Sequence, residues 1–190
     1  MHQKILDHVS KIIDLTDDEK AEFMSILSLV KLSKKDYLIK SGEFVHYNFF
    51  VVKGCLRAFY RDDQENEANL QFAMEDWWIS DYEALSDGIP ARLNVECLED
   101  CELLAIHRDA QEELYRRIPK FERFFRIKVM NSFIALRCRI MSSLQKSSKE
   151  RYLEFYDRFP ELENRIANYH IANYLGIKPE SLSRIRKELI

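Results

Sequence analysis

The sequence predicts an α+β chain with N-terminal helices, a double-stranded β-helix (jelly-roll) barrel, a long dimerisation helix and a C-terminal helix-turn-helix. Three patterns in series support this fold class. A capped helical segment opens the chain, short β-branched and aromatic runs follow, and an uninterrupted helical pattern then replaces them. The chain has 190 residues, of which 46% are hydrophobic, so it can bury a core and does not belong to the disordered or low-complexity classes.

The first elements are predicted from local signals. Thr16 and Glu19 have the spacing of a capping box, so we expect a helix over residues 17–30, with a short helix before it. Turn signals such as Ser41-Gly42 and Lys53-Gly54 then punctuate a series of β-branched and aromatic runs. We expect strands at residues 37–39, 49–52, 56–60, 69–72, 93–95 and 103–106. Short strands at this spacing favour a jelly roll.

A long helix is predicted over residues 120–145, because Pro119 suits a helix start and nothing after it breaks the pattern. One face of this helix carries apolar residues at spacings of three and four, as in a coiled-coil seam. The stripe consists of Val129, Phe133, Leu136 and Ile140, with Phe125 and Leu144 flanking it, and the interface is expected to include Phe125. It fits a subunit interface, since so long a helix outreaches a small barrel, or it fits packing of the helix on its own barrel. A further helix is expected over residues 150–158.

The segment 168–187 has the pattern of two helices joined by a tight turn. Ala172 is small where a second helix would cross, and Gly176 suits a left-handed turn position. The inward residues of the second helix would be Leu182, Ile185 and Leu189, and its outward face is polar. This layout predicts a helix-turn-helix, although a structural helical hairpin with a solvated face has the same pattern.

The net charge of −3 conceals an asymmetry along the chain. Residues 1–119 carry 14 Lys and Arg against 24 Asp and Glu, whereas residues 120–190 carry 15 against 8. A basic C-terminal third suggests a polyanionic partner, and chance clustering of solvated charges is the alternative.

The order of these elements resembles the Crp/Fnr family of bacterial transcription regulators across essentially the whole chain. Residues 176–187, Gly-Ile-Lys-Pro-Glu-Ser-Leu-Ser-Arg-Ile-Arg-Lys, look like that family's recognition helix. Ser41-Gly42-Glu43 and the run 50–54 resemble early strands of its cyclic-nucleotide-binding domain. The resemblance implies a sensor domain at 1–118, a dimerisation helix at 119–146 and a helix-turn-helix domain at 147–190, the last without a C-terminal wing. The implied partners are double-stranded DNA and a second copy of the chain.

Family resemblance also suggests roles for single residues. Glu180 and Arg184 would read bases, Ser181 and Ser183 would lie near phosphates, and Lys178 and Lys187 flank that face.

The effector pocket of relatives that bind cyclic AMP matches Ser80, Asp81, Tyr82, Arg92 and Leu93. Ser80 replaces a glycine and Leu93 replaces a serine that holds the phosphate, so the pocket is degenerate. We therefore expect a small-molecule effector of unknown identity, if there is one, rather than cyclic AMP.

Other chemistries find little support in the sequence. The four cysteines do not form a disulfide framework or a cluster motif, and Cys97 and Cys101 would share a buried strand face. A jelly-roll metalloenzyme needs clustered histidines, but the barrel region has only His46 and His107. We therefore expect no catalysis, no metal and no cofactor.

Since no apolar run is long enough for a membrane helix, a cytoplasmic location is expected. The alternative function is a jelly-roll ligand-binding or protein-interaction module without sequence-specific DNA binding.

Overall fold

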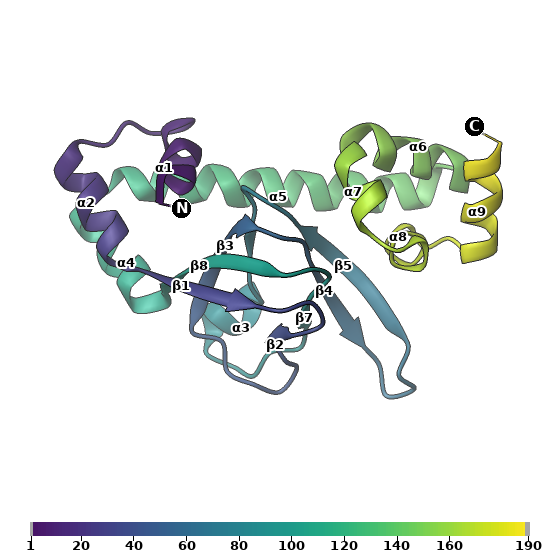
Figure 1. Ribbon diagram of the computed structural model, residues 1–190, viewed down its shortest axis with the longest axis horizontal. Coiled ribbons are helices and arrows are strands. Elements are labelled where there is room, and N and C mark those ends of the chain that lie inside the picture. The colour runs from purple at the N-terminus through teal and green to yellow at the C-terminus, as the bar shows by residue number, and fades with distance from the viewer. Residues whose placement is uncertain (1, 189–190) are drawn as a thin grey trace.

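The computed structural model describes residues 2–188, and its parts lie along one long helix (Figure 1). Two antiparallel sheets lie beside the middle of that helix, the N-terminal helices lie at one end and the C-terminal helices at the other. The helices are α1 His2–Ser10, α2 Asp17–Ser25, α3 Tyr82–Asp87, α4 Arg108–Arg117, α5 Lys120–Gln145, α6 Ser148–Arg158, α7 Pro160–Arg165, α8 Asn168–Leu175 and α9 Pro179–Lys187. The strands are β1 Leu27–Leu32, β2 Tyr37–Ile39, β3 Tyr47–Lys53, β4 Leu56–Arg61, β5 Glu67–Ala73, β6 Trp78–Ile79, β7 Asn94–Cys97 and β8 Cys101–His107.

The strands form two antiparallel four-stranded sheets, in line with the predicted jelly roll, but they do not close into a barrel. Their orders are β1-β8-β3-β6 and β2-β7-β4-β5, and every pair is antiparallel. Inward side chains of both sheets, including Val51, Leu56, Val95 and Leu103, are fully buried between them. Because β1 and β2 are edges of different sheets, the barrel stays open between them.

The predicted helix over residues 17–30 is wrong in its second half. The capping box at Thr16 is confirmed, with reciprocal hydrogen bonds between Thr16 and Glu19, but α2 ends at Ser25. Strand β1 occupies the remainder of the predicted helix and pairs with β8 from Leu27↔Ile106 to Leu32↔Cys101. A helical start signal fixes only the first turn, whereas the conformation of the later residues is determined by pairing with a strand distant in sequence.

Several short elements lacked a sequence signal of their own. The two-residue strand β6 and the helices α3, α4 and α7 were not expected, and α6 begins at Ser148 rather than at residue 150. In α6 the first turn is fixed by a second capping box between Ser147 and Glu150. The expected burial of Cys97 and Cys101 is confirmed, although they lie on two strands, β7 and β8, and not on one.

The long helix α5 has the predicted bounds, and only its first turns are buried. Phe121, Phe124 and Phe125 pack among α1, α2, α4 and β6, with the ring of Phe125 5.0 Å from that of Trp78. The predicted interface is therefore wrong at Phe125, which belongs to the chain's own core. Beyond Phe125 no residue of α5 is buried. No helix within residues 2–188 is both long and apolar enough to cross a membrane.

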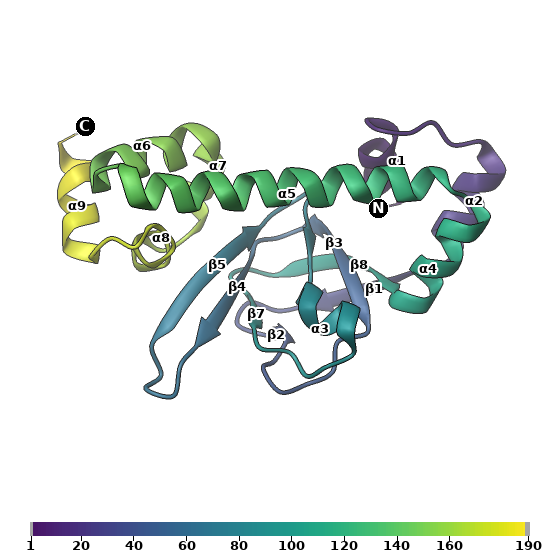
Figure 2. The same ribbon diagram turned by 180° about the vertical axis from the view of Figure 1, so that it is seen from behind.

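The C-terminal helices lie at the far end of α5, as Figure 2 shows from behind. They form a further buried cluster there. Fully buried Ile171, Ala172 and Leu182 lie at its centre. Phe72 of β5 and Cys55, in the turn between β3 and β4, complete the same cluster, so these helices are packed against the strands.

His8 on α1 is buried between the rings of Phe50 and Phe124, and neither of its ring nitrogens has a hydrogen-bond partner within the described chain. Burial in the first place, and nearby Lys128 in the second, lower the pKa of His8 from 6.5 to about 4, while Asp76 opposes the shift. The folded chain therefore holds His8 neutral at pH values at which the unfolded chain protonates it.

This shift predicts a stability loss in acid. Between pH 6.5 and pH 4 the unfolded chain binds a proton at His8, whereas the folded chain does not. The free energy of unfolding therefore falls as the pH drops through this range, by up to about 3 kcal/mol. The variant His8→Leu should lack this pH-dependent loss, so its urea midpoint at pH 4.5 should be higher than that of the wild type. The exposed His2→Gln on the same helix is the matched control and should follow the wild type. Equal losses in His8→Leu and wild type would contradict the assignment.

Candidate effector loop and nucleic-acid interface

Asp81 organises residues 80–93, here called the effector loop, which contain α3 and in which the sequence places the effector pocket. Its carboxylate is buried at the start of α3, where Oδ1 accepts a hydrogen bond from the Ala84 amide at 3.2 Å. Its Oδ2 accepts from the amides of Arg92 and Leu93, each at 3.0 Å. A buried carboxylate with three amide donors is well satisfied. Asp81 therefore holds the two halves of the predicted pocket together and has little capacity left for a ligand.

The other predicted pocket residues lie on the same loop but do not converge on a common space. Ser80 is buried and its hydroxyl donates to the Tyr47 carbonyl at 2.9 Å, while Tyr82 is half-exposed and its hydroxyl lies 3.3 Å from Asn48. The side chain of Arg92 is 69% exposed and lies 3.8 Å from Glu83. Leu93 is only partly buried.

A hollow of about 340 Å³ lies instead at the opening between the edges β1 and β2. None of the five predicted pocket residues lines it. Its walls are mainly apolar side chains with three hydroxyl groups, from Ser28, Val30, Leu32, Tyr37, Leu38, Tyr47, Phe49 and Ala105. Sequence reasoning missed this hollow because its lining comes from four strands without a shared motif.

The turn between α8 and α9 has the geometry that its sequence predicts. Gly176 adopts a left-handed conformation with φ +63°, and the Ile177 amide donates to the Ala172 carbonyl at 2.9 Å. Pro179 occupies the first position of α9, and Leu182 and Ile185 face the core as expected. Leu189, predicted on the same face, lies outside the described residues.

The outward face of α9 is polar and open to solvent. Lys178, Glu180, Ser183, Arg184 and Lys187 are exposed, and Ser181 is half-buried. The Ser183 hydroxyl also accepts a hydrogen bond from the Asn168 side chain at 3.0 Å.

Sequence reasoning missed Arg186, which braces α9 against its neighbours. Its guanidinium lies 2.8 Å from the Glu163 carboxylate and donates to the Asn168 side chain at 2.9 Å. Because Arg186 and Glu163 are far apart in the sequence, no local pattern predicts their ion pair.

Many exposed apolar residues lie on the part of α5 beyond Phe125. Val129, Phe133, Leu136 and Ile140 of the predicted stripe are 61%, 59%, 48% and 50% exposed. Further exposed apolar residues of the same helix are Met130, Ile134, Met141 and Leu144. So large an apolar surface on one helix is uncommon in a monomer and is typical of an interface.

Comparison with known proteins matches residues 29–118 to the family model of the cyclic nucleotide-binding domain. No curated protein matches the sequence. Among solved structures, FixK2 from Bradyrhizobium japonicum is similar with a TM-score of 0.74 and 18% identity, over 86% of this chain and 84% of that one. The c-di-GMP-responsive global regulator CLP of Xanthomonas campestris gives a TM-score of 0.72 at 12% identity, over 92% of this chain and 91% of that one. A putative transcriptional regulator of the Crp/Fnr family from Eubacterium rectale gives a TM-score of 0.69 at 17% identity, over 92% of this chain and 83% of that one.

Proposed function

We propose that this chain, which has the fold of Crp/Fnr regulators and a cyclic nucleotide-binding domain at residues 29–118, is a transcription regulator that binds DNA as a homodimer. In this proposal α8 and α9 are a helix-turn-helix, residues 1–118 are a sensor domain, residues 119–146 form the dimerisation helix and residues 147–190 form the DNA-binding domain. The role is regulatory rather than catalytic. The observation that carries the proposal is the exposed, polar face of α9 after a left-handed turn.

The chemistry of α9 supports contact with DNA. Glu180 and Arg184 lie four residues apart on the exposed face, so both can reach base edges together. Arginine can bind guanine in bidentate fashion and glutamate can accept from cytosine, whereas lysines such as Lys178 and Lys187 suit phosphates. Ser181 and Ser183 can add phosphate contacts.

Dimerisation through α5 is supported by the helix's length and surface. With 26 residues it spans about 39 Å, and the part beyond Phe125 has no buried residue. Burying Val129, Phe133, Leu136 and Ile140 against a second copy would remove this apolar stripe from water and place two copies of α9 on one DNA. A two-fold dimer matches two half-sites about one DNA turn apart.

The alternative, a sensor or interaction module whose helical tail contacts only proteins, fits α9 less well. Protein-binding surfaces carry apolar or aromatic anchors at their centre. The exposed residues of α9 are charged or polar apart from Pro179.

Cyclic AMP is not expected to bind by the mode of its known receptors. Asp81 is occupied by backbone amides, Leu93 has no hydroxyl, and Arg92 pairs with Glu83 at the surface. Calorimetric titration of the wild type with cyclic AMP should therefore show no binding at micromolar concentrations, and Arg92→Ala should behave identically. Micromolar binding that Arg92→Ala abolishes would contradict the degenerate pocket.

The dimer is expected to depend on the centre of the α5 stripe. Replacing Phe133 and Leu136 by Glu would bury two charges in the interface and should give monomers in sedimentation velocity. The matched control replaces Asn131 and Gln145 by Glu, which adds the same charge on the opposite side of the helix and should leave the dimer intact. A Phe133→Glu, Leu136→Glu variant that remains dimeric would place the interface elsewhere.

DNA binding should respond differently to two residues of α9. Arg184→Ala should weaken binding at the cognate site by about 1–3 kcal/mol and relax discrimination at one base position per half-site. Lys187→Ala should weaken binding to all sequences alike and reduce the salt dependence by about one unit per contact.

Fluorescence anisotropy on fragments of the protein's own promoter region, at several salt concentrations, measures both effects. Arg116→Ala, on the distant α4, is the control and should bind as the wild type does. A wild-type dimer that binds no such fragment at low salt, with or without cell extract, would refute the DNA-binding proposal and favour the interaction module.

A further inference from the structure

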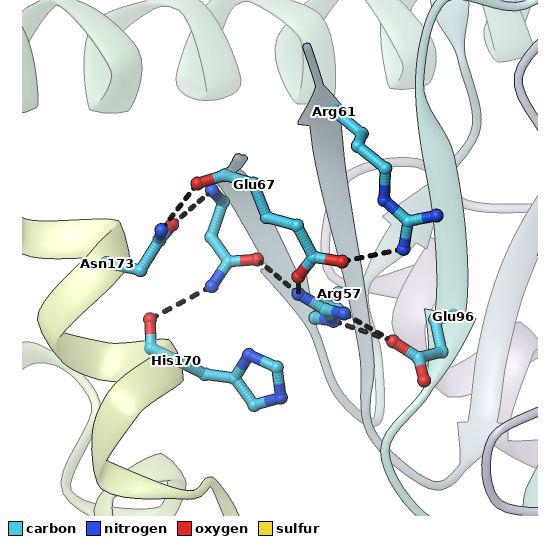
Figure 3. A network of polar contacts seen from close by, with 7 residues as sticks. Arg57, Arg61, Glu67, Glu96, His170 and Asn173 are labelled. Carbon is cyan, nitrogen blue, oxygen red and sulfur yellow. Dashed lines mark hydrogen bonds and ion pairs between the residues drawn. The ribbon is translucent and has the colours of Figure 1, made fainter. Parts of the chain in front are cut away.

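Helix α8 is attached to the edge strand β5 by the side-chain amide of Asn173 (Figure 3). Its Oδ1 accepts from the Asn69 backbone amide at 2.6 Å and its Nδ2 donates to the Glu67 carbonyl at 2.6 Å. These are main-chain groups of an edge strand, which another strand would otherwise pair with. Asn173 therefore attaches the C-terminal helices to the main-chain groups of β5 that no neighbouring strand pairs with.

A second, buried contact lies beside the first. The side chain of Asn69 is 4% exposed, and its Nδ2 donates to the His170 carbonyl of α8 at 3.0 Å. Its Oδ1 accepts from Arg57 Nη1 at 3.2 Å. One asparagine thus joins the backbone of α8 to a buried arginine of the sheet.

Arg57 holds this contact through two carboxylates. The guanidinium is 5% exposed on β4, with Nη1 at 2.5 Å from Glu67 and Nη2 at 2.6 Å from Glu96. Arg61 also pairs with Glu67, at 2.7 Å. A buried charge of this kind is costly to leave without its partner, so Arg57, Glu67, Glu96 and Asn69 fix one another's positions.

Glu96 connects this network to the effector loop. It lies on β7, which begins at Asn94, directly after the Arg92 and Leu93 amides that Asp81 holds. A displacement of that loop therefore changes the position of a carboxylate on which Arg57 depends.

The polar groups carry much of the docking at this point. A hollow of about 320 Å³ separates the sheet residues from Tyr169, Ile177 and Pro179, so close apolar packing does not fill the junction. Apolar contact lies farther along, where the rings of Phe72 and Tyr174 are 5.1 Å apart and Cys55 joins the same buried cluster. Because most of that cluster comes from the C-terminal helices themselves, they can lose the polar contact and stay folded.

We propose that Arg57, Glu67, Asn69 and Asn173 form a latch between β5 and α8, and that Glu96 makes the closing of this latch depend on the effector loop. The latch fixes how α9 is presented, so its opening is a regulatory step between the sensor and the C-terminal helices. The regulatory meaning rests on the proposed DNA binding, whereas the latch itself does not.

The first test breaks the latch without changing its shape. Asn173→Asp retains the acceptor for the Asn69 amide but places a carboxylate oxygen against the Glu67 carbonyl. Hydrogen exchange followed by mass spectrometry should then accelerate about tenfold in peptides covering residues 67–73 and 168–175, and remain unchanged in β1 and β8. Asn164→Asp on exposed α7 adds the same charge and should exchange as the wild type does. Unchanged exchange in Asn173→Asp would overturn the latch.

The second test perturbs the network from the sensor side. Glu96→Gln removes the charge paired with Arg57 without touching α8, and it should accelerate exchange in residues 168–175 as well as in β7. Glu102→Gln on β8 removes another strand carboxylate, which pairs with Lys31, and should leave α8 unchanged. Acceleration in Glu96→Gln that is confined to β7 would overturn the dependence on the effector loop.

The third measurement tests the regulatory meaning. The Asn173→Asp dimer should bind a DNA fragment about tenfold more weakly than the Asn164→Asp dimer, because released helices must be ordered again on the DNA. Equal affinities of the two variants would overturn the regulatory role. If no form of the protein binds DNA, the proposed function fails, and the exchange experiments still decide whether the latch exists.

Discussion

Phe121, Phe124 and Phe125 anchor the first turns of α5 between the N-terminal helices and the sheet β1-β8-β3-β6. Their rings lie against one another and against Phe23 and Trp78, at centroid distances from 4.6 to 6.4 Å. Each buried aromatic side chain contributes about 1.5–3 kcal/mol, so this cluster fixes the direction of the helix. Everything C-terminal to it depends on that direction: the exposed stripe follows the free part of α5, and the helices α6–α9 lie where α5 ends (Figure 1).

The far end of α5 needs attachments of its own, because a helix anchored at one end leaves the other end free to move. Arg165 on α7 supplies one attachment, since it pairs with Glu75 at 2.7 Å and with Glu99, both in loops of the sheet. Asn173 and Asn69 supply another at β5. All of these are polar contacts, which exchange with water at lower cost than the release of an apolar core. The N-terminal end of α5 is therefore held by an apolar cluster, whereas the helices at its far end are held by these polar contacts together with a smaller apolar contact at Phe72 and Cys55.

How much of this could be predicted from the sequence depends on the range of each signal. The bounds of α5, the Gly176 turn and most strands follow from local patterns, and all were predicted correctly. The end of α2 was not, because pairing of β1 with β8 joins residues almost eighty positions apart. Phe125 continues the spacing of the stripe, yet tertiary packing takes it into the core. The latch joins residues about a hundred positions apart through asparagine side chains, for which no periodicity exists.

The candidate effector loop is a second place where the sequence indicates which residues matter but not what their side chains contact. The family resemblance points to Asp81 as a pocket residue, but only the structure shows that its carboxylate accepts hydrogen bonds from three backbone amides. A loop that an internal carboxylate already orders does not need a ligand to take its shape, so ligand binding at that loop would gain little from ordering it. Hollows of about 340 and 320 Å³ lie instead at the opening between β1 and β2 and at the junction of β5 with α8. None of the residues that match the effector pocket lines either hollow, so the space open to a ligand differs from the space that the matching residues indicate.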